Sequence, residues 1–294
     1  MAWEQYVIES APMELEQIEQ VLLDCGAVAV SLEDAGDVPI LEPAPGQTPL
    51  WPRMRIRALF ETGAGKDSVG ARLLGLLPLG SIATIEPVGD EDWTRAWLAH
   101  ARPIWFGDRL CVTPAELAPP EGRAAIVKLD PGLAFGTGTH PSTAACLEWL
   151  ATAAIDDSRV LDYGCGSGVL AIAACKLGAR RATAIDIDPQ ALVACRANAQ
   201  ANGCAGKIGV LAPERLAACA YDVVIANILA GPLMALAPVF AALVRPGGAL
   251  VLAGMLTNQA DDVAAAHADA FAFAPPRRRE SWAMLAGTRR DAAG

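Results

Sequence analysis

Apolar and polar positions along the first ninety residues have the periods of a small α+β unit. In Pro12–Cys25 the apolar residues recur every three or four positions, as on a helix with one buried face. In Met54–Glu61 the apolar positions alternate with mostly polar ones, as in a half-buried strand. The patterns predict strands and helices, in chain order, at Trp3–Glu9, Pro12–Cys25, Ala27–Leu32, Met54–Glu61, Val69–Leu77 and Ser81–Pro87. The resulting order β-α-β-β-α-β is that of ferredoxin-like domains, which serve many functions.

From about residue 105 the pattern changes to short β-branched runs that alternate with alanine-rich helical stretches. These segments are Val160–Tyr163, Leu170–Lys176, Ala182–Ile187, Ala191–Ala201, Val223–Ile228, Leu233–Val244 and Ala249–Ala253. Alternating strands and helices predict a parallel sheet with helices on both faces, which is a doubly wound α/β fold.

A change of pattern between the two parts suggests where one domain ends and the next begins. Asp90–His100 has two tryptophans one helical turn apart and is expected to form a connecting helix. We therefore expect a small domain at residues 1–89, a helical linker at 90–104 and a second domain at 105–294.

Composition agrees with a chain of two folded domains. The 294 residues suffice for two domains of ~150 residues, and 53% hydrophobic against 19% charged residues excludes a disordered chain. Val223–Val244 carries no charge over 22 residues, but it contains Asn, Gly and two Pro residues. A buried strand and helix therefore explain this stretch better than a membrane span does. No secretory signal is visible, and we expect a soluble, cytoplasmic protein.

The cysteines and histidines form no recognisable metal site. The eight cysteines include no C-x-x-C pair, and several lie in apolar stretches, so buried free thiols in a reducing compartment are expected. The three histidines are too scattered along the chain to indicate a zinc site. We expect no bound metal.

Negative charge is concentrated near the N-terminus. Residues 1–61 hold 11 Asp and Glu against 3 Arg, a net charge of −8, whereas the remaining residues contribute only −2. An acidic segment repels nucleic acid and attracts basic partners, so no direct contact with nucleic acid is expected and a lysine-rich protein partner is favoured. Acidic surface that serves only solubility is the equally weighted alternative. We expect no membrane contact and a monomeric protein.

The strongest chemical signal is a glycine-rich turn after a buried strand. The strand that ends at Asp162 is followed by Gly164, Gly166 and Gly168, which lead into a helix. Glycine permits positive φ values and lets a ligand lie against the backbone at a helix N-terminus. A turn that binds nothing is the alternative interpretation.

A second acidic residue narrows the choice of ligand. Asp186 lies 22 residues after Gly164 at the end of the next strand, where a carboxylate can accept both hydroxyls of a ribose. The spacing G-x-G-x-G differs from the G-x-G-x-x-G of dinucleotide-binding folds. Asp162 would repel a phosphate but suits a cationic group, so S-adenosylmethionine is favoured over NAD.

Two further segments could contribute to the same site. Asn227 ends another buried strand, where its amide could orient an amine nucleophile or hold a cofactor, although it could equally be a strand terminator. Leu129–Thr143 is rich in Gly, Thr and Ser. Within it, Thr143 could cap a helix or reach a carboxylate, and Phe135 could form an apolar lid. His140 is as good a candidate for a structural role as for a catalytic one.

These motifs resemble those of known enzymes. Asp162-Tyr-Gly-Cys-Gly-Ser-Gly168, together with Asp186, resembles the class I S-adenosylmethionine-dependent methyltransferases. One family among them, the bacterial methyltransferases of ribosomal protein L-eleven (L11), is similar at the motifs Asp130-Pro-Gly-Leu-Ala-Phe-Gly-Thr-Gly-Thr-His-Pro141, Asp186-Ile-Asp-Pro-Gln-Ala191 and Asn227-Ile-Leu-Ala-Gly-Pro-Leu233. The resemblance covers nearly the whole chain.

The resemblance implies a class I methyltransferase domain preceded by a ferredoxin-like domain that holds the substrate. It implies S-adenosylmethionine as cofactor and methylation of lysine side chains and of the N-terminal α-amine of L11. Combined with the motifs above, the expected cofactor site consists of Thr143, Gly164, Gly166, Asp186 and Asn227, together with Asp162, Gly168 and Phe135. Asn227 is also expected to position the substrate amine.

Three other functions stay open on the sequence. An RNA or small-molecule methyltransferase could use the same scaffold, although the acidic N-terminal segment argues against RNA. A nicotinamide-dependent oxidoreductase is disfavoured by the glycine spacing. A non-catalytic adaptor could have kept the fold, and only an assay distinguishes it from an enzyme.

Overall fold

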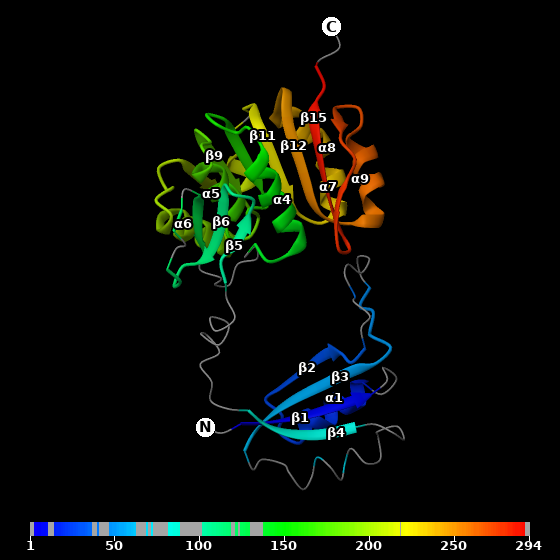
Figure 1. Ribbon diagram of the computed structural model, residues 1–294. Coiled ribbons are helices and arrows are strands. Elements are labelled where there is room, and N and C mark those ends of the chain that lie inside the picture. Colours follow the sequence, from blue (N-terminus) through cyan, green and yellow to red (C-terminus); the bar gives the residue numbers. More distant parts are fainter. Residues whose placement is uncertain are drawn as a thin grey trace. The chain divides into compact units, whose positions relative to one another are not determined.

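In the computed structural model the chain divides into two units, Met1–Ala99 and His100–Gly294 (Figure 1). The structure describes residues 3–10, 15–36, 40, 47–62, 69, 72, 82–88, 102–118, 121–122, 124–129, 138–217 and 219–291. The connecting helix predicted at Asp90–His100 lies outside these residues and stays a prediction. Most of the helix predicted at Val69–Leu77 also lies outside them, although Val69 and Arg72 are helical.

The described strands of the N-terminal unit have the order expected of a ferredoxin-like domain. Its strands are β1 (Trp3–Ser10), β2 (Ala29–Asp34), β3 (Met54–Glu61) and β4 (Ile82–Val88), in the order β2-β3-β1-β4 with every neighbouring pair antiparallel. Helix α1 (Leu15–Asp24) buries Ile18 and Leu22 in one apolar cluster with residues of β1 and β3. The helical period of the sequence in α1 and the alternating period in β3 therefore predict the type of each element and the face that it buries.

The second unit is built on one large sheet. Its strand order is β10-β9-β8-β11-β12-β15-β13, and β14 also pairs with β15. The strands are β8 (Arg159–Tyr163), β9 (Arg181–Ile185), β10 (Ile208–Leu211), β11 (Tyr221–Asn227), β12 (Val244–Leu256), β13 (Phe271–Phe273), β14 (Arg277–Arg279) and β15 (Trp282–Arg289).

The prediction of a parallel sheet is confirmed for the strands that were predicted, but the sheet continues beyond them with antiparallel strands. The strands from β10 to β12 in this order are parallel, but β15 is antiparallel to β12, β13 and β14. A tight hairpin joins β14 to β15, and such a turn can only join antiparallel strands. No strand was predicted beyond Ala253, so the sequence patterns did not show that β13, β14 and β15 join the large sheet.

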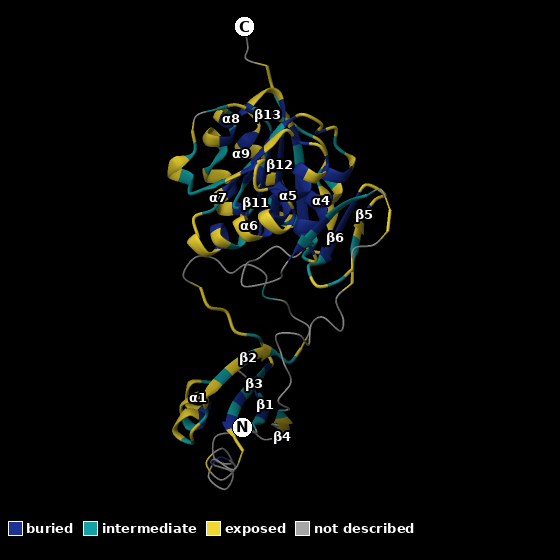
Figure 2. Ribbon diagram, turned by 90° about the vertical axis from the view of Figure 1, so that its left-hand side faces the viewer, coloured by how far each residue is buried: buried dark blue, intermediate teal, exposed yellow. Residues whose placement is uncertain are grey.

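Helices cover both faces of the sheet, as predicted for a doubly wound fold. Along β11, Val223 and Ile225 face one apolar cluster whereas Val224 and Ala226 face another. The first cluster includes α4 (Pro141–Thr152), α5 (Val169–Lys176) and α6 (Pro189–Ala201), and the second includes α7 (Ala230–Ala235), α8 (Ala237–Leu243) and α9 (Ala260–His267). Figure 2 shows the buried residues gathered on the strands and on the helix sides that meet them.

The single helix predicted at Leu233–Val244 is two short helices, α7 and α8, and Val244 already belongs to β12. Pro238 lies in the first turn of α8, and a proline cannot donate the hydrogen bond that would continue α7 through this point. The uncharged stretch at 223–244 thus forms a strand and two helices. None of the helices in the described residues is long and apolar enough to cross a membrane.

A small sheet precedes the large one and was not predicted. It consists of β5 (Ile104–Phe106), β6 (Leu110–Pro114) and β7 (Ala125–Leu129), in the order β5-β6-β7. Val127 and Leu129 of β7 join the same apolar cluster as α4 and α5. This sheet therefore extends the core on the side of the large sheet that carries α4, α5 and α6.

The topology also determines where a ligand can bind. From β8 the sheet continues through β9 and β10 in one direction and through β11 and β12 in the other. In open α/β sheets, ligands bind outside the carboxyl ends of the strands at such a reversal. The carboxyl ends of β8 and β11 carry Tyr163 and Asn227, next to the glycine-rich turn.

Candidate functional site

The glycine-rich turn joins β8 to α5 and requires glycine for its backbone shape. Gly164, Gly166 and Gly168 have φ values of 78°, 49° and 80°, a region that residues with side chains rarely adopt. The N–H groups of Gly164 and Cys165 both donate to the carbonyl oxygen of Ile185, at 2.8 and 2.9 Å. The turn is thereby fixed against the carboxyl end of β9.

Asp186 follows β9 and is fixed by backbone donors on both of its oxygens. Its Oδ2 accepts from the N–H of Gly166 at 2.9 Å, and its Oδ1 accepts from the N–H of Asp188 at 3.0 Å. Each carboxylate oxygen can accept a second hydrogen bond, so the group can still bind ligand hydroxyls. The carboxylate predicted to hold a ribose therefore lies directly beside the glycine turn.

Asn227 and Thr143 meet across the sheet edge although they are 84 residues apart. Asn227 ends β11, and Thr143 lies in the first turn of α4. The amide Nδ2 of Asn227 lies 3.0 Å from Oγ1 of Thr143 and donates to it. In this arrangement the side-chain oxygen Oδ1 of Asn227 can still accept a hydrogen bond from a ligand.

Two hollows adjoin these residues and form one site. The larger has a volume of about 400 Å³ and is lined by Tyr163, Gly164, Gly166, Ile185, Asp186, Ile187, Pro213, Asn227, Ile228, Leu229, Pro232 and Leu236. The smaller is lined by Thr143, Gly164, Cys165, Gly166, Val169, Leu170 and Asn227. Five of the predicted residues thus line one continuous site, namely Thr143, Gly164, Gly166, Asp186 and Asn227.

Sequence reasoning missed the apolar walls of the larger hollow. Ile187 and Leu229 are 86% and 53% exposed, which is unusual for large apolar side chains. Each follows shortly after a polar residue of the site, Asp186 and Asn227 respectively. Apolar side chains one or two positions after the polar residue at a strand end were therefore the available signal, because exposed apolar patches mark binding surfaces.

Asp162 and Gly168 border neither hollow. Asp162 is fully buried, and its Oδ2 accepts from the N–H of Ala171 at 3.0 Å, whereas Oδ1 has no hydrogen-bond partner. Burial, with a smaller contribution from Asp186, raises the pKa of Asp162 to about 7. Its carboxyl group holds the start of α5 in place behind the glycine turn.

Gly168 is the N-cap of α5, and its role is close packing between helices. A Cβ atom at this position would lie 2.5 Å from Sγ of Cys195 in α6. Only glycine lets the two helices approach so closely.

His140 takes a structural position, and Phe135 lies outside the described residues. The ring of His140 caps α4 by accepting from the N–H of Ser142 at 3.4 Å, and it packs on Trp282 with ring centroids 4.6 Å apart. Burial lowers the pKa of His140, which favours the neutral ring that can accept this bond. The role of Phe135 as an apolar lid stays a prediction.

Other candidate chemistry is absent from the described part of the chain. All eight cysteines are free thiols, six of them buried and Cys25 and Cys219 half-buried. No cluster of His, Cys, Asp and Glu among the described residues could hold a metal ion. The site instead offers an apolar hollow, one fixed carboxylate, and an amide with a hydroxyl. This set of groups fits a nucleoside whose ribose hydroxyls contact Asp186 and whose substituent on the ribose extends to Asn227.

Comparisons with known proteins agree over the whole chain. The family model described as Ribosomal protein L11 methyltransferase (PrmA) matches residues 2–290. A relative from Pseudomonas putida, named ribosomal protein L11 methyltransferase, is 48% identical over 295 residues that cover 99% of this chain and 100% of the relative. A relative of the same name from Nitrosococcus oceani is 45% identical over 292 residues, with 99% and 100% covered.

A solved structure agrees with this result. The crystal structure of ribosomal protein L11 methylase from Lactobacillus delbrueckii subsp. bulgaricus matches with a TM-score of 0.58 and 30% identity. The match covers 64% of this chain and 99% of that chain. The matching family, the relatives along their full length and the shared fold lead to one conclusion: this chain belongs to the ribosomal protein L11 methyltransferase family.

Proposed function

We propose that this protein is an S-adenosylmethionine-dependent methyltransferase that methylates lysine side chains and the N-terminal α-amine of ribosomal protein L11. The observation that carries the proposal is the site itself. Asp186 lies beside the glycine turn, and the Asn227–Thr143 pair adjoins the same turn. Membership of the family supplies the substrate class.

The residues present suit the parts of S-adenosylmethionine one by one. The carboxylate of Asp186 can accept the two ribose hydroxyls as charge-assisted hydrogen bonds. Ile187 and Leu229 provide apolar walls for the adenine ring. Gly164 and Gly166 let the ligand approach the backbone of the turn, because neither residue has a side chain.

Methyl transfer asks mainly for positioning. When bound, S-adenosylmethionine supplies a methyl group on a positively charged sulfur. The protein must hold an amine nitrogen about 3–3.5 Å from that carbon with its lone pair in line. The site provides fixed groups for this purpose, since both Asp186 and Asn227 are held by hydrogen bonds.

The attacking amine has to be unprotonated. A lysine in water has a pKa near ~10.4 and is charged at neutral pH. An amine that enters the site loses contact with water, which disfavours the charged ammonium, and the nearby positive sulfur disfavours it further, so both lower the pKa of the amine. The proton can then leave to water, and no dedicated base is needed.

Asn227 is the residue we assign to positioning the amine. Its Nδ2 donates to Thr143, which leaves the carbonyl oxygen free to accept an N–H of the substrate amine. A neutral acceptor suits this task, because it orients the N–H without stabilising the charged ammonium as strongly as a carboxylate would.

The test is a transfer assay with three candidate acceptors. The full-length chain is incubated with radiolabelled S-adenosylmethionine and, separately, with purified L11, ribosomal RNA and a mixture of small amines. Label is expected in L11 alone, and mass spectrometry of the labelled peptides is expected to place it on lysines and the N-terminus. Label in RNA or small amines, or in nothing, would overturn the proposed substrate.

A further inference from the structure

Within the described residues, no helix covers the amino-terminal part of β9 and β10 on the face opposite α5 and α6. The crossovers that follow β8, β9 and β11 each contain helices, but the connection from β10 to β11 is only residues 212–220. In its described part it holds a single 3-10 turn, η3 (Pro213–Arg215). Parallel strands are normally covered on both faces. So short a connection cannot place a helix over the face of β9 opposite α5 and α6.

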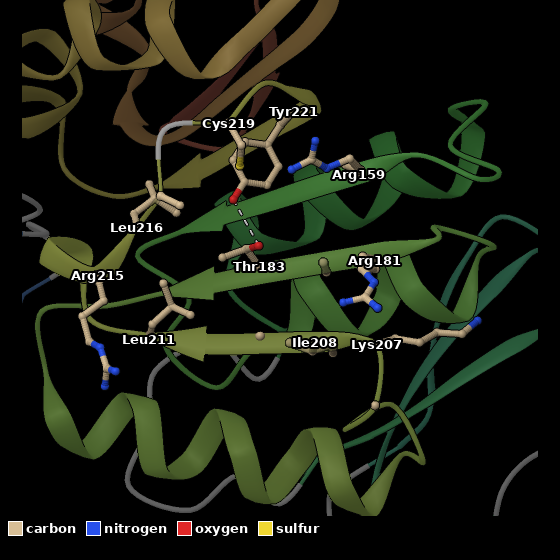
Figure 3. A pocket seen from close by; sticks show the side chains of 14 residues that line it. Arg159, Arg181, Thr183, Lys207, Ile208, Leu211, Arg215, Leu216, Cys219 and Tyr221 are labelled. Carbon is tan, nitrogen blue, oxygen red and sulfur yellow. Dashed lines mark hydrogen bonds between the residues drawn. The ribbon is translucent and has the colours of Figure 1, made fainter.

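A groove of about 410 Å³ occupies this uncovered face. Ala182 of β9 points into the cluster under α5 and α6, whereas Thr183 points to the groove. The hydroxyl of Tyr221 donates to Oγ1 of Thr183 at 3.1 Å, in the middle of the groove (Figure 3). Pro213 lines the cofactor hollow and Arg215 lines this groove, so η3 lies between two separate sites.

Four cationic side chains line the groove. Figure 3 shows Arg159, Arg181 and Lys207 toward the amino ends of the strands, and Arg215 with Leu211 and Leu216 toward their carboxyl ends. The guanidinium of Arg159 lies over the ring of Tyr221, 5.4 Å from its centroid. This stacking orients the guanidinium and leaves its N–H donors available.

These cations differ from other arginines of the same unit. Arg245 pairs with Asp222 at 2.6 Å, and Arg279 pairs with Glu148 at 2.7 Å. In the described part of the chain, none of the four groove cations forms an ion pair, and no described residue that lines the groove is acidic. A protein with a net charge of −10 thus keeps a positive groove, although Asp222, which accepts from the backbone N–H of Arg159 at 2.8 Å, partly balances the charge of Arg159.

We propose that this groove binds the phosphate backbone of RNA. Its cations are spread along the groove and do not converge on one point, so a single phosphate can meet only some of them. An extended RNA strand carries one charge on every nucleotide and can contact both ends at once. The guanidinium groups of Arg159 and Arg181 match phosphate in a bidentate manner.

The choice of RNA over other polyanions rests on the proposed function, because a ribosomal protein is met in an RNA-rich setting. The acidic N-terminal segment led us to expect no contact with nucleic acid, but that segment belongs to the first unit. The groove lies wholly in the second unit. It would hold RNA that accompanies the substrate and would not itself be the methylated group.

The experiment measures binding of a fluorescent single-stranded RNA of about 20 nucleotides to the full-length protein by anisotropy over a range of salt concentrations. The test variant is Arg181→Glu with Lys207→Glu. The matched control is Arg277→Glu with Arg278→Glu, which makes the same charge change on the exposed strand β14. A milder variant, Arg181→Gln with Lys207→Gln, guards against misfolding, and circular dichroism checks each protein.

Wild-type affinity is expected to fall steeply with salt. The groove reversal should weaken binding at least about tenfold and lower the slope of log K against log salt by about two, whereas the control should change affinity less than about twofold. Binding that is absent at low salt, equal losses in test and control, or stronger competition by polyglutamate than by unlabelled RNA would each overturn the proposal.

A separate readout distinguishes this inference from the proposed function. Methylation of free L11 without RNA is expected to be unchanged in the groove variants, because Arg181 and Lys207 line neither hollow of the cofactor site. If wild-type protein failed to methylate L11, the proposed function would fall, while RNA binding by the groove would still be decided by the anisotropy data.

Discussion

Asp186 connects the glycine turn, the start of α6 and the ligand hollow through one carboxylate. Replacing it with alanine removes the acceptors for Gly166 and Asp188 and for the ribose hydroxyls. We expect Asp186→Ala to weaken S-adenosylmethionine binding by about 2–3 kcal/mol, roughly 30- to 150-fold, because two charge-assisted hydrogen bonds are lost. Isothermal titration calorimetry measures this directly.

Asp188 supplies a matched control for that measurement. It is the N-cap of α6, with its Oδ1 2.8 Å from the N–H of Gln190, and it lines neither hollow. Asp188→Ala should lower stability by about 1 kcal/mol and leave cofactor affinity nearly unchanged. A folded Asp186→Ala protein with wild-type affinity would remove Asp186 from the site.

Asp162 gives a prediction for the pH dependence of stability. Its pKa rises from 3.8 to about 7 on folding, so the folded state binds a proton more tightly than the unfolded state between these values. The free energy of unfolding therefore falls as pH rises from about 4 to about 7, by on the order of 3–4 kcal/mol from this group. Asp162→Asn cannot titrate, so its unfolding free energy should decline less over the same range.

Denaturant titrations at several pH values check this difference. The exposed Asp261, changed to asparagine, serves as the control and should follow the wild-type curve. Parallel curves for wild type and Asp162→Asn would show that Asp162 is not protonated in the folded protein near neutral pH.

The substitution Asn227→Ala distinguishes a role in cofactor binding from a role in positioning the substrate amine. Asn227→Ala removes one neutral hydrogen bond, which alone is worth about 1 kcal/mol, or roughly fivefold. If the amide orients the amine, the single-turnover rate of methyl transfer should fall further than that, because misplacement of the nucleophile is costly. A change in cofactor affinity with an unchanged single-turnover rate would make Asn227 a binding residue only.

At the scale of elements, the glycines of the turn have two different roles, one in the ligand site and one in helix packing. Gly164 and Gly166 border the ligand site, whereas Gly168 lets α5 pack against α6. Polar groups fixed from three elements then surround the turn, namely Asp186 after β9, Asn227 at the end of β11 and Thr143 in α4. Hydrogen bonds to Asp186 and Ile185 hold the turn itself in place before any ligand arrives.

Gly168→Ala should destabilise the fold through this helix contact. The new Cβ would lie 2.5 Å from Sγ of Cys195 at a φ of 80°, which combines overpacking with left-handed strain. We expect a loss of about 2–4 kcal/mol in the free energy of unfolding, measured by chemical denaturation. Gly203→Ala, with a φ of 68° and open space around it, should lose only about 1–2 kcal/mol.

A second substitution separates the steric clash with Cys195 from the backbone strain at residue 168. Cys195→Ala removes the sulfur that the new methyl would meet, so it should recover part of the loss in Gly168→Ala. Equal losses at Gly168 and Gly203, without recovery, would contradict the close contact between α5 and α6.

At the scale of the whole molecule, charge and chemistry belong to different units. The predicted cofactor residues all lie in the second unit, while most of the net negative charge lies in the first. Two acidic residues of this segment are paired locally, since Glu9 pairs with Arg55 at 2.7 Å and Glu33 with Arg57 at 2.8 Å. The arginines are already counted in the net charge of −8 of residues 1–61, so the excess of acidic residues stays after this pairing.

We expect deletion of residues 1–99 to leave cofactor affinity nearly intact while methylation of L11 falls steeply. The acidic unit should attract and orient a lysine-rich substrate, and this steering is lost with it. Added salt should reproduce part of the loss in the intact enzyme, because screening shortens the reach of surface charge to ~8 Å. Calorimetry and the transfer assay measure the two effects.

Two outcomes would contradict this division of labour. One is a truncated protein that methylates L11 at the full rate. The other is a truncated second unit that does not fold, as judged by circular dichroism, which would make the first unit part of its core.

The sequence by itself determined those elements that have a clear helical or alternating period, and the polar residues at the ends of the strands. Helical and alternating periods depend on neighbours along the chain, so α1, β3 and the strands β8, β9, β11 and β12 could be placed in advance, whereas β10 was missed. The motifs also named Thr143, Gly164, Gly166, Asp186 and Asn227, because a glycine turn and a polar strand end are local features. The ferredoxin-like order followed from the sequence of elements alone.

Only the tertiary structure decided which of these groups meet and which face stays open. Asn227 contacts Thr143 over 84 residues, and Asp162 turns out to be buried behind the turn that it precedes. The antiparallel return of β15 and the uncovered groove at β9 and β10 also depend on the path of the chain. Contacts between distant segments depend on crossovers and packing, which no local period encodes.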